Sequence, residues 1–329
     1  MNQGYESDTC HAYVQGVSTS YGYVPSLAAA VVFVALFGVS MLVHTAQMIW
    51  YRSWWCSVFC IGCLVELLGW AARIWSSQCP YAQTPYLMQI TTLIIAPTFF
   101  TAGIYVLLGR LIAIFGPKSS VLSPKLYIWI FCSCDIIALV VQAAGGGMAS
   151  SGASGGSSSQ SSAAGKSANL SHASSSNTQD TGTHVMVAGI IFQLVSITAF
   201  VALAADFALR VSRQIRRAGS QINKCLLLLG AAVAFSLVLI YIRSVYRTIE
   251  LLHGWTSSTM RNEKLLIGLD AAMMVPAVMI FNVFHPSYLL PRLENSTQYM
   301  KADAMELNAG ADQYQVVEQC DRELLLRRI

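Results

Sequence analysis

The 329-residue chain is 55% hydrophobic and only 11% charged, and its mean hydropathy is +0.53. A soluble domain has no core large enough to hide this much apolar surface, so these figures exclude an ordinary water-soluble fold. The formal net charge of +4 says little by itself, and we expect no nucleic-acid partner. The composition predicts an all-α, multi-pass integral membrane protein.

Windows of about 20 mostly apolar residues, long enough to cross a roughly 30 Å hydrocarbon layer as helix, recur seven times. They lie near residues 25–50, 54–75, 86–114, 125–149, 184–209, 224–250 and 264–285. The segment before the first window has no lysine or arginine, unlike the basic start of a cleaved signal peptide, so we expect this window to remain as a span. The predicted fold is a seven-transmembrane helix bundle.

The basic residues fall unequally on the two sets of connecting segments. Fourteen lie in one set, which includes Arg52, Arg110 and the run from Arg210 to Lys224, whereas the opposite set holds three. Because basic loops stay in the cytoplasm, this bias predicts an external N-terminus and a cytoplasmic C-terminus. We expect Arg213, Arg216 and Arg217 to lie against the anionic lipids of the inner leaflet.

This topology divides the chain into five parts. They are an extracellular N-terminal segment (1–24), transmembrane helices 1–4 (25–149), a flexible Ser/Gly-rich external loop (150–183), transmembrane helices 5–7 (184–285) and a cytoplasmic tail (286–329). The loop has too few large apolar residues to order itself. Cys10 and Cys79 both fall on the oxidising side, and the sequence leaves open whether a disulfide joins them.

Ionisable residues interrupt several of the spans. Glu66 lies about 18 Å from the start of its helix, near the bilayer centre. A charge that faces lipid there costs about 2.5–3.5 kcal/mol, so such groups are expected to face a partner or a watery cavity. The candidate binding residues are Glu66, Arg73, Asp135, Gln142, Arg243, Arg247, Glu250 and Asp270.

These groups come from four helices at compatible depths, which favours a common site in the outer half of the bundle. In the functional interpretation, Glu66 and Asp270 receive an amine head group and the arginines act as charge partners or head-group anchors. Gln142 then forms a neutral wall, and apolar side chains take the tail. The alternative is structural: the charges pair inside the bundle and fix the helix register.

Backbone breaks accompany these charges. Pro97 and Pro276 each remove a helical hydrogen bond. Such a break is tolerated at membrane depth only where a neighbouring side chain or water satisfies the freed carbonyl. No H-x-x-x-H pair, G-x-S-x-G elbow or Walker loop is present, so we expect neither enzyme activity nor a cofactor or metal.

Several segments carry a resemblance to a known family: "IGCLVELLGWAARI", "LYIWIFCSCDIIALVVQAAGGGMAS", "RSVYRTIE" and "DAAMMVPAVMIFNVFHP". The chain resembles the fungal seven-helix Rta-like lipid-translocating exporters. The resemblance implies a plasma-membrane protein that exports or helps to move amphiphilic lipids or drugs, such as sphingoid long-chain bases, and confers resistance to toxic amphiphiles. The alternatives are a lipid-sensing receptor or regulator of lipid asymmetry, an organiser of lipid domains, and a membrane lipid-amide hydrolase.

Overall fold

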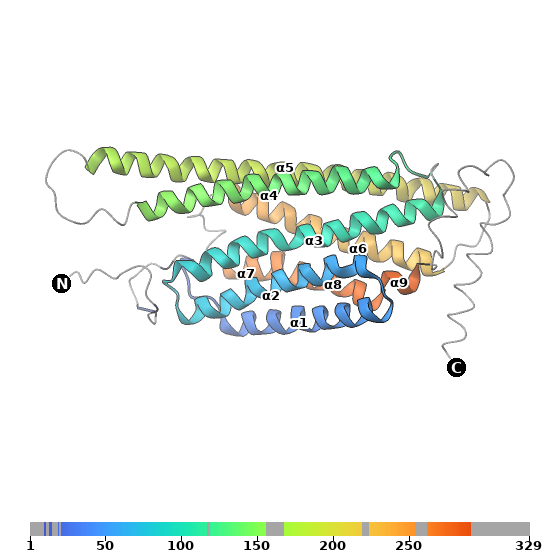
Figure 1. Cartoon of the computed structure of the whole chain (residues 1–329), viewed down its shortest axis with the longest axis horizontal. Coiled ribbons are helices and arrows are strands. Elements are labelled where there is room, and N and C mark those ends of the chain that lie inside the picture. The colour runs from blue at the N-terminus through green and yellow to red at the C-terminus, as the bar shows by residue number, and fades with distance from the viewer. Residues whose placement is uncertain are drawn as a thin grey trace.

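The computed structural model describes Cys10, Tyr13, Val14, Thr19 and residues 21–116, 119–155, 168–218, 224–253 and 262–290. Within these ranges, the side chains of 150–179, 217, 218 and 224 are not described. All regular secondary structure in the described ranges is helical (Figure 1). Seven helical segments are long and apolar enough to cross a membrane, which confirms the predicted number of spans. The orientation of the termini stays a prediction.

Six spans are formed by single helices. They are α1 (Leu27–Trp50), α2 (Ser57–Gln78), α3 (Gln83–Phe115), α4 (Pro124–Gly155), α5 (Ala168–Ala218) and α6 (Lys224–Leu252), with a 3₁₀ turn, η1 (Trp54–Cys56), before α2. The seventh span is broken into α7 (Glu263–Leu266), a π-helical turn η3 (Ile267–Ala271), α8 (Ala272–Val283) and α9 (Pro286–Leu289).

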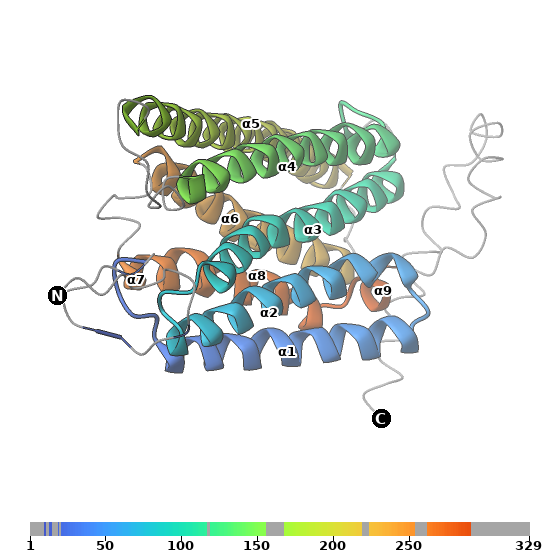
Figure 2. The ribbon, with the colours of Figure 1, turned by 60° about the vertical axis from the view of Figure 1, so that its left-hand side comes forward.

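The helices form layers that place α3 and α6 in the middle of the bundle. α4 and α5 lie side by side along one edge, and α1 lies along the opposite edge, next to α2 and α8 (Figure 2). α3 packs against α2, α4 and α6, so it separates α2 from the α4–α5 pair. The charged residues of α6 and η3 meet where these two elements pack against each other.

Local sequence explains where several helices begin and end. The Ser26 side chain accepts a hydrogen bond from Ala29 N and caps α1, and the Asn262 side chain accepts one from Lys264 N and caps α7. These caps satisfy amides that have no partner within the first turn of a helix. Gly116 ends α3 with a φ of 88°, a conformation that a side chain would strain.

Glycines allow close contact between neighbouring helices. A Cβ at Gly62 in α2 would lie 2.5 Å from Phe100 of α3, and a Cβ at Gly103 would lie 2.5 Å from Phe59. A Cβ at Gly145 of α4 would lie 2.4 Å from the backbone nitrogen of Met186 in α5. The absence of a side chain at Gly145 therefore allows the backbones of α4 and α5 to lie close together.

The helices also cover part of the segment predicted to be a flexible loop. α4 continues to Gly155 and α5 starts at Ala168, so both helices reach past the rest of the bundle at the end where α1 begins (Figure 1). Residues 156–167 of this predicted loop and residues 291–329 of the predicted tail lie outside the described residues.

At the same end, a disulfide joins Cys10 to Cys79, with 4.7 Å between their Cα atoms. This bond settles the pairing that the sequence left open. It ties the segment before α1 to the C-terminal end of α2. We call this end of the bundle the disulfide end.

Candidate functional site

At the disulfide end, Arg73 of α2 is fully buried and lies among tyrosines. Its Nη2 donates hydrogen bonds to the Glu263 carboxylate at 2.7 Å and to the Tyr23 hydroxyl at 3.1 Å. The guanidinium carbon lies 5.7 Å from the ring centroids of Tyr21, Tyr23 and Trp70. Aromatic faces attract a cation at this range, so the three rings stabilise the positive charge of the guanidinium in addition to its hydrogen bonds. We call Tyr21, Tyr23, Arg73 and Glu263 the Arg73 cluster.

The segment before α1 is held over this cluster. The Tyr21 hydroxyl donates to Gln89 Oε1 at 2.8 Å and shares a 2.9 Å hydrogen bond with Ser76. Ser26 N donates to Glu263 at 2.7 Å. Burial raises the pKa of Tyr21 to about 12, and burial also raises the pKa of Tyr23. Both phenols are therefore neutral at physiological pH.

Deeper in the bundle, four residues of α6 and η3 form an ion-pair network. Arg243 and Arg247 both pair with Asp270, and Arg247 also donates to Glu250 at 2.9 Å. Glu250 accepts a second bond, from the Tyr246 hydroxyl at 2.9 Å. The spacing of Arg243, Arg247 and Glu250, four and three residues apart, puts all three on one face of α6. We call these four charged residues the Asp270 network.

Arg243 also satisfies the backbone at Pro97. In a regular helix, the amide of residue 97 would donate to the carbonyl of residue 93, but proline has no N–H. The Arg243 guanidinium donates to this Leu93 carbonyl instead. The sequence predicts that a neighbour or water satisfies the freed carbonyl, and in the structure this neighbour is a member of the charged site. The proline and the arginine are thus one structural unit that joins α3 to α6.

Asp270 lies within the π-helical turn η3 and is 2% exposed. A π turn adds a residue to the helical repeat, and such turns occur frequently at functional sites. The turn directs the Asp270 carboxylate toward α6, where it meets two guanidinium groups. A regular helical repeat does not predict this direction.

Glu66 stands apart from these ion pairs although it is 1% exposed. Its Oε1 has no hydrogen-bond partner among the described residues. Its charged neighbours are Arg243, which acts on it most strongly, followed by Asp270 and Arg247. Glu66 is therefore a buried carboxylate at the border of the Asp270 network with no ion pair of its own in the described structure.

Two predicted site residues lie elsewhere. Asp135 of α4 accepts hydrogen bonds from Tyr105 at 2.9 Å and Thr101 at 3.2 Å, both from α3. Within the described ranges, no hydrogen bond or ion pair connects Asp135 to the Asp270 network. Gln142, also on α4, donates to Gln193 Oε1 of α5 at 2.8 Å. The structure thus groups five predicted residues, Glu66 with the Asp270 network, and leaves Asp135, Gln142 and Arg73 in separate contacts.

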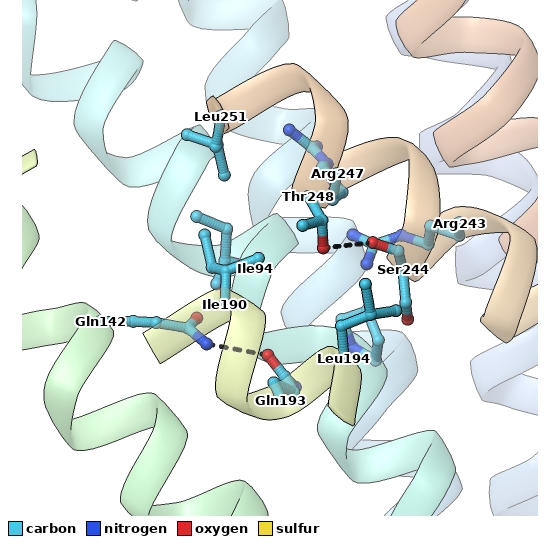
Figure 3. Close-up of a pocket in the computed structure, with 11 residues that line it drawn as sticks. Ile94, Gln142, Ile190, Gln193, Leu194, Arg243, Ser244, Arg247, Thr248 and Leu251 are labelled. Carbon is cyan, nitrogen blue, oxygen red and sulfur yellow. Dashed lines mark hydrogen bonds between the residues drawn. The ribbon is translucent and has the colours of Figure 1, made fainter. Parts of the chain in front are cut away.

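A cavity of about 40 Å³ lies between α3, α4, α5 and α6. Its polar lining comes from Gln142, Gln193, Arg243, Ser244, Arg247 and Thr248. Figure 3 shows the two glutamines on one side and the α6 residues on the other, with aliphatic side chains between them. A water molecule needs about 10–15 Å³ in this measure, so the cavity has room for a small polar group and not for an acyl chain.

Four residues that contribute to these sites were not predicted from the sequence: Tyr21, Tyr23, Glu263 and Gln193. Glu263 follows a helix-capping Asn262, and the tyrosines form the pattern "YGYVP" before the first span. These signals indicate a helix start and an interfacial aromatic pair. Their contact with Arg73 depends on how α2 and α7 are placed, which the sequence does not give.

Comparison with known proteins gives a family match across most of the membrane region. The family described as "RTA1 like protein" matches residues 59–168 and 160–293. The sphingoid long-chain base transporter RSB1 of Saccharomyces cerevisiae is 28% identical over 299 residues, which cover 81% of this chain and 73% of the relative. Protein RTM1 and protoporphyrin uptake protein 1 of the same yeast are each 25% identical, over 80% of this chain and 90% of each relative. No solved structure matches.

Proposed function

Because the chain belongs to the RTA1-like family, as the sequence resemblance predicted, we propose that it transports amphiphiles with an amine head group across the plasma membrane, sphingoid long-chain bases among them. Two relatives are named for transport or uptake of amphiphilic molecules, and neither is named as an enzyme. These names support a membrane transporter. We propose in addition that the substrate carries an amine, that the membrane is the plasma membrane, and that the buried charged residues bind the amine.

The observation that carries the proposal is the charge balance of the buried sites. The Arg73 cluster, the Asp270 network and Glu66 contain three arginines and four carboxylates. Three of these carboxylates have a salt bridge and Glu66 has none in the part of the chain that is described. A carboxylate anion buried here without a partner would cost several kcal/mol, and the ammonium group of a long-chain amine would compensate that charge.

The ion pairs around Glu66 have a different role. Arg243, Arg247 and Asp270 neutralise one another, so they support the structural alternative of the sequence analysis for these three residues. Their fixed geometry holds a polar wall beside Glu66 inside an otherwise apolar bundle. The amine then binds at Glu66, while its hydrocarbon chain remains in the lipid or against the apolar helix surfaces.

A sequence of polar groups leads from the disulfide end toward Glu66. Glu250 of the Asp270 network interacts electrostatically with Tyr23 of the Arg73 cluster and with Tyr86 of α3. Within the same network, Arg243 interacts electrostatically with Glu66. A cationic head group that enters at the disulfide end meets tyrosines and carboxylates on this route, and both groups stabilise a cation.

The opposite end fits an anionic membrane surface. α5 continues to Ala218, and Arg213 and Arg216 near its end are exposed. Each basic residue at a membrane surface contributes about 1 kcal/mol of attraction to anionic lipid. With Arg217, whose side chain lies outside the described residues, they would hold this end at the cytoplasmic leaflet of the plasma membrane.

Export of phytosphingosine from cells tests the proposed function. Glu66→Gln keeps the shape of the side chain and removes its charge, and we expect export to fall about tenfold or more because a charged hydrogen bond is worth about 1.5–3 kcal/mol. Asp206→Asn is the control, because Asp206 forms an exposed pair with Arg210 on α5. Unchanged export by the Glu66 variant at normal surface expression would refute the proposal.

A further inference from the structure

The cavity between α3, α4, α5 and α6 has a polar lining that the amine site at Glu66 does not use. No carboxylate is among the described residues that line it, so it does not suit an amine. Its arginines are already paired with Asp270 and Glu250, so it does not carry a free positive charge for an anion either. The remaining groups are neutral donors and acceptors.

The two glutamines leave a donor and an acceptor unused. Gln142 Nε2 donates to Gln193 Oε1, which leaves the amide nitrogen of Gln193 without a described partner. Gln142 Oε1 is buried and also has none in the described structure. If both amides flip together, the same pair of free groups is presented with the residues exchanged, so this conclusion does not depend on the amide assignment.

A hydroxyl group matches this lining because it donates one hydrogen bond and accepts others. On the α6 side, Arg247 Nε is buried without a hydrogen-bond partner in the described residues, and it offers a further donor. The Thr248 hydroxyl donates to Ser244 O and keeps its oxygen lone pairs for a ligand. The cavity volume of about 40 Å³ corresponds to a few water-sized groups.

We propose that this cavity recognises the hydroxyl groups of the transported amphiphile, with Gln142 and Gln193 as specificity-determining residues. The inference rests on the proposed function and adds the site and the residues that distinguish an amine with neighbouring hydroxyls from a plain amine. Arg243 lines the cavity and also interacts electrostatically with Glu66, so one side chain connects the two sites. A plain alkylamine fills the amine site and leaves the cavity groups unpaired.

Binding to the purified protein in nanodiscs tests the inference, with empty nanodiscs to correct for partition into lipid. The ligands are sphinganine and octadecylamine, which share an amine and an 18-carbon chain, while only sphinganine has hydroxyls. We expect sphinganine to bind about tenfold tighter than octadecylamine, because two neutral hydrogen bonds distinguish them. Gln193→Leu removes most of this preference and leaves octadecylamine binding unchanged.

Two further variants separate recognition from folding. Thr248→Val keeps the side-chain shape and removes the hydroxyl, and we expect it to reduce the preference about threefold. Gln214→Leu, at an exposed position of α5, is the control and leaves the preference unchanged. Equal binding of the two ligands by the wild-type protein, or an equal loss of both with Gln193→Leu, would overturn the inference.

The proposed function and this inference are tested by different variants, so either can fail without the other. Glu66→Gln lowers the binding of both ligands if the amine site is correct. If Glu66→Gln changes neither, the amine site is wrong, while a preference for sphinganine that depends on Gln193 still supports the cavity. The two results are read from different variants of the same protein.

Discussion

The buried pair of Arg243 and Asp270 makes a direct energetic prediction. Their side chains are 4% and 2% exposed, so neither charge is screened by water. Asp270→Leu leaves Arg243 without its salt bridge and deprives Arg247 of one partner, which we expect to cost about 3–5 kcal/mol in the free energy of unfolding. Arg243→Met leaves Asp270 with Arg247 as its remaining ion-pair partner, gives the network an excess negative charge and also frees the Leu93 carbonyl, with a similar cost.

The double variant removes both charges at once. Each single change leaves the Asp270 network with a net buried charge, whereas the double change leaves it neutral as the Arg247–Glu250 pair. The destabilisation of the double variant is therefore smaller than the sum of the two singles by about 3 kcal/mol. The assay is unfolding of the purified protein by SDS titration, followed by intrinsic fluorescence. Asp206 and Arg210 form the matched control pair, with side chains 39% and 43% exposed, and their coupling is expected below about 1 kcal/mol. Equal coupling in the two cycles would refute the reasoning.

Three further predictions concern packing, the disulfide and pH. Gly62→Ala places a Cβ 2.5 Å from Phe100 and is expected to destabilise the protein by about 1–3 kcal/mol, whereas Gly230→Ala, with open space around it, is expected to be neutral or slightly stabilising; thermal unfolding compares them. Cys79→Ser removes the disulfide, which closes a loop with a sequence separation of 69, and lowers the free energy of unfolding by about 2–4 kcal/mol; the wild type is measured without reductant so that its disulfide stays intact. Burial raises the pKa of Tyr21 from 10.0 to about 12, so the folded state holds the phenol proton more tightly and stability decreases as pH rises from about 10 to about 12; in Tyr21→Phe this decrease is smaller.

The position of each charged residue along its helix could be predicted from the sequence, but its direction around the helix axis could not. Glu66 and Asp135 lie at similar predicted depths, so counting along each helix predicted that both belong to one common site. α3 lies between α2 and α4, so Asp135 meets the hydroxyls of Tyr105 and Thr101 instead. Neighbour relations among seven helices are set by packing, which a hydropathy pattern does not contain.

The grouping of Arg243, Arg247 and Glu250 was predictable because all three are on one helix with regular spacing. The role of Pro97 was predictable in part: the freed carbonyl follows from proline chemistry, and its position identifies Leu93 as the acceptor. The donor, Arg243, is 150 residues away in the chain. The π turn that directs Asp270 toward this arginine had no signal in the sequence.

The central claim is that Glu66 receives the charge of a long-chain amine inside the bundle. Sphinganine flux across proteoliposomes of purified protein measures this most directly, with wild type and Glu66→Gln compared at equal reconstitution and equal thermal stability. We predict flux with the wild type and a loss of about tenfold or more with Glu66→Gln. Equal flux from the two proteins would contradict the account.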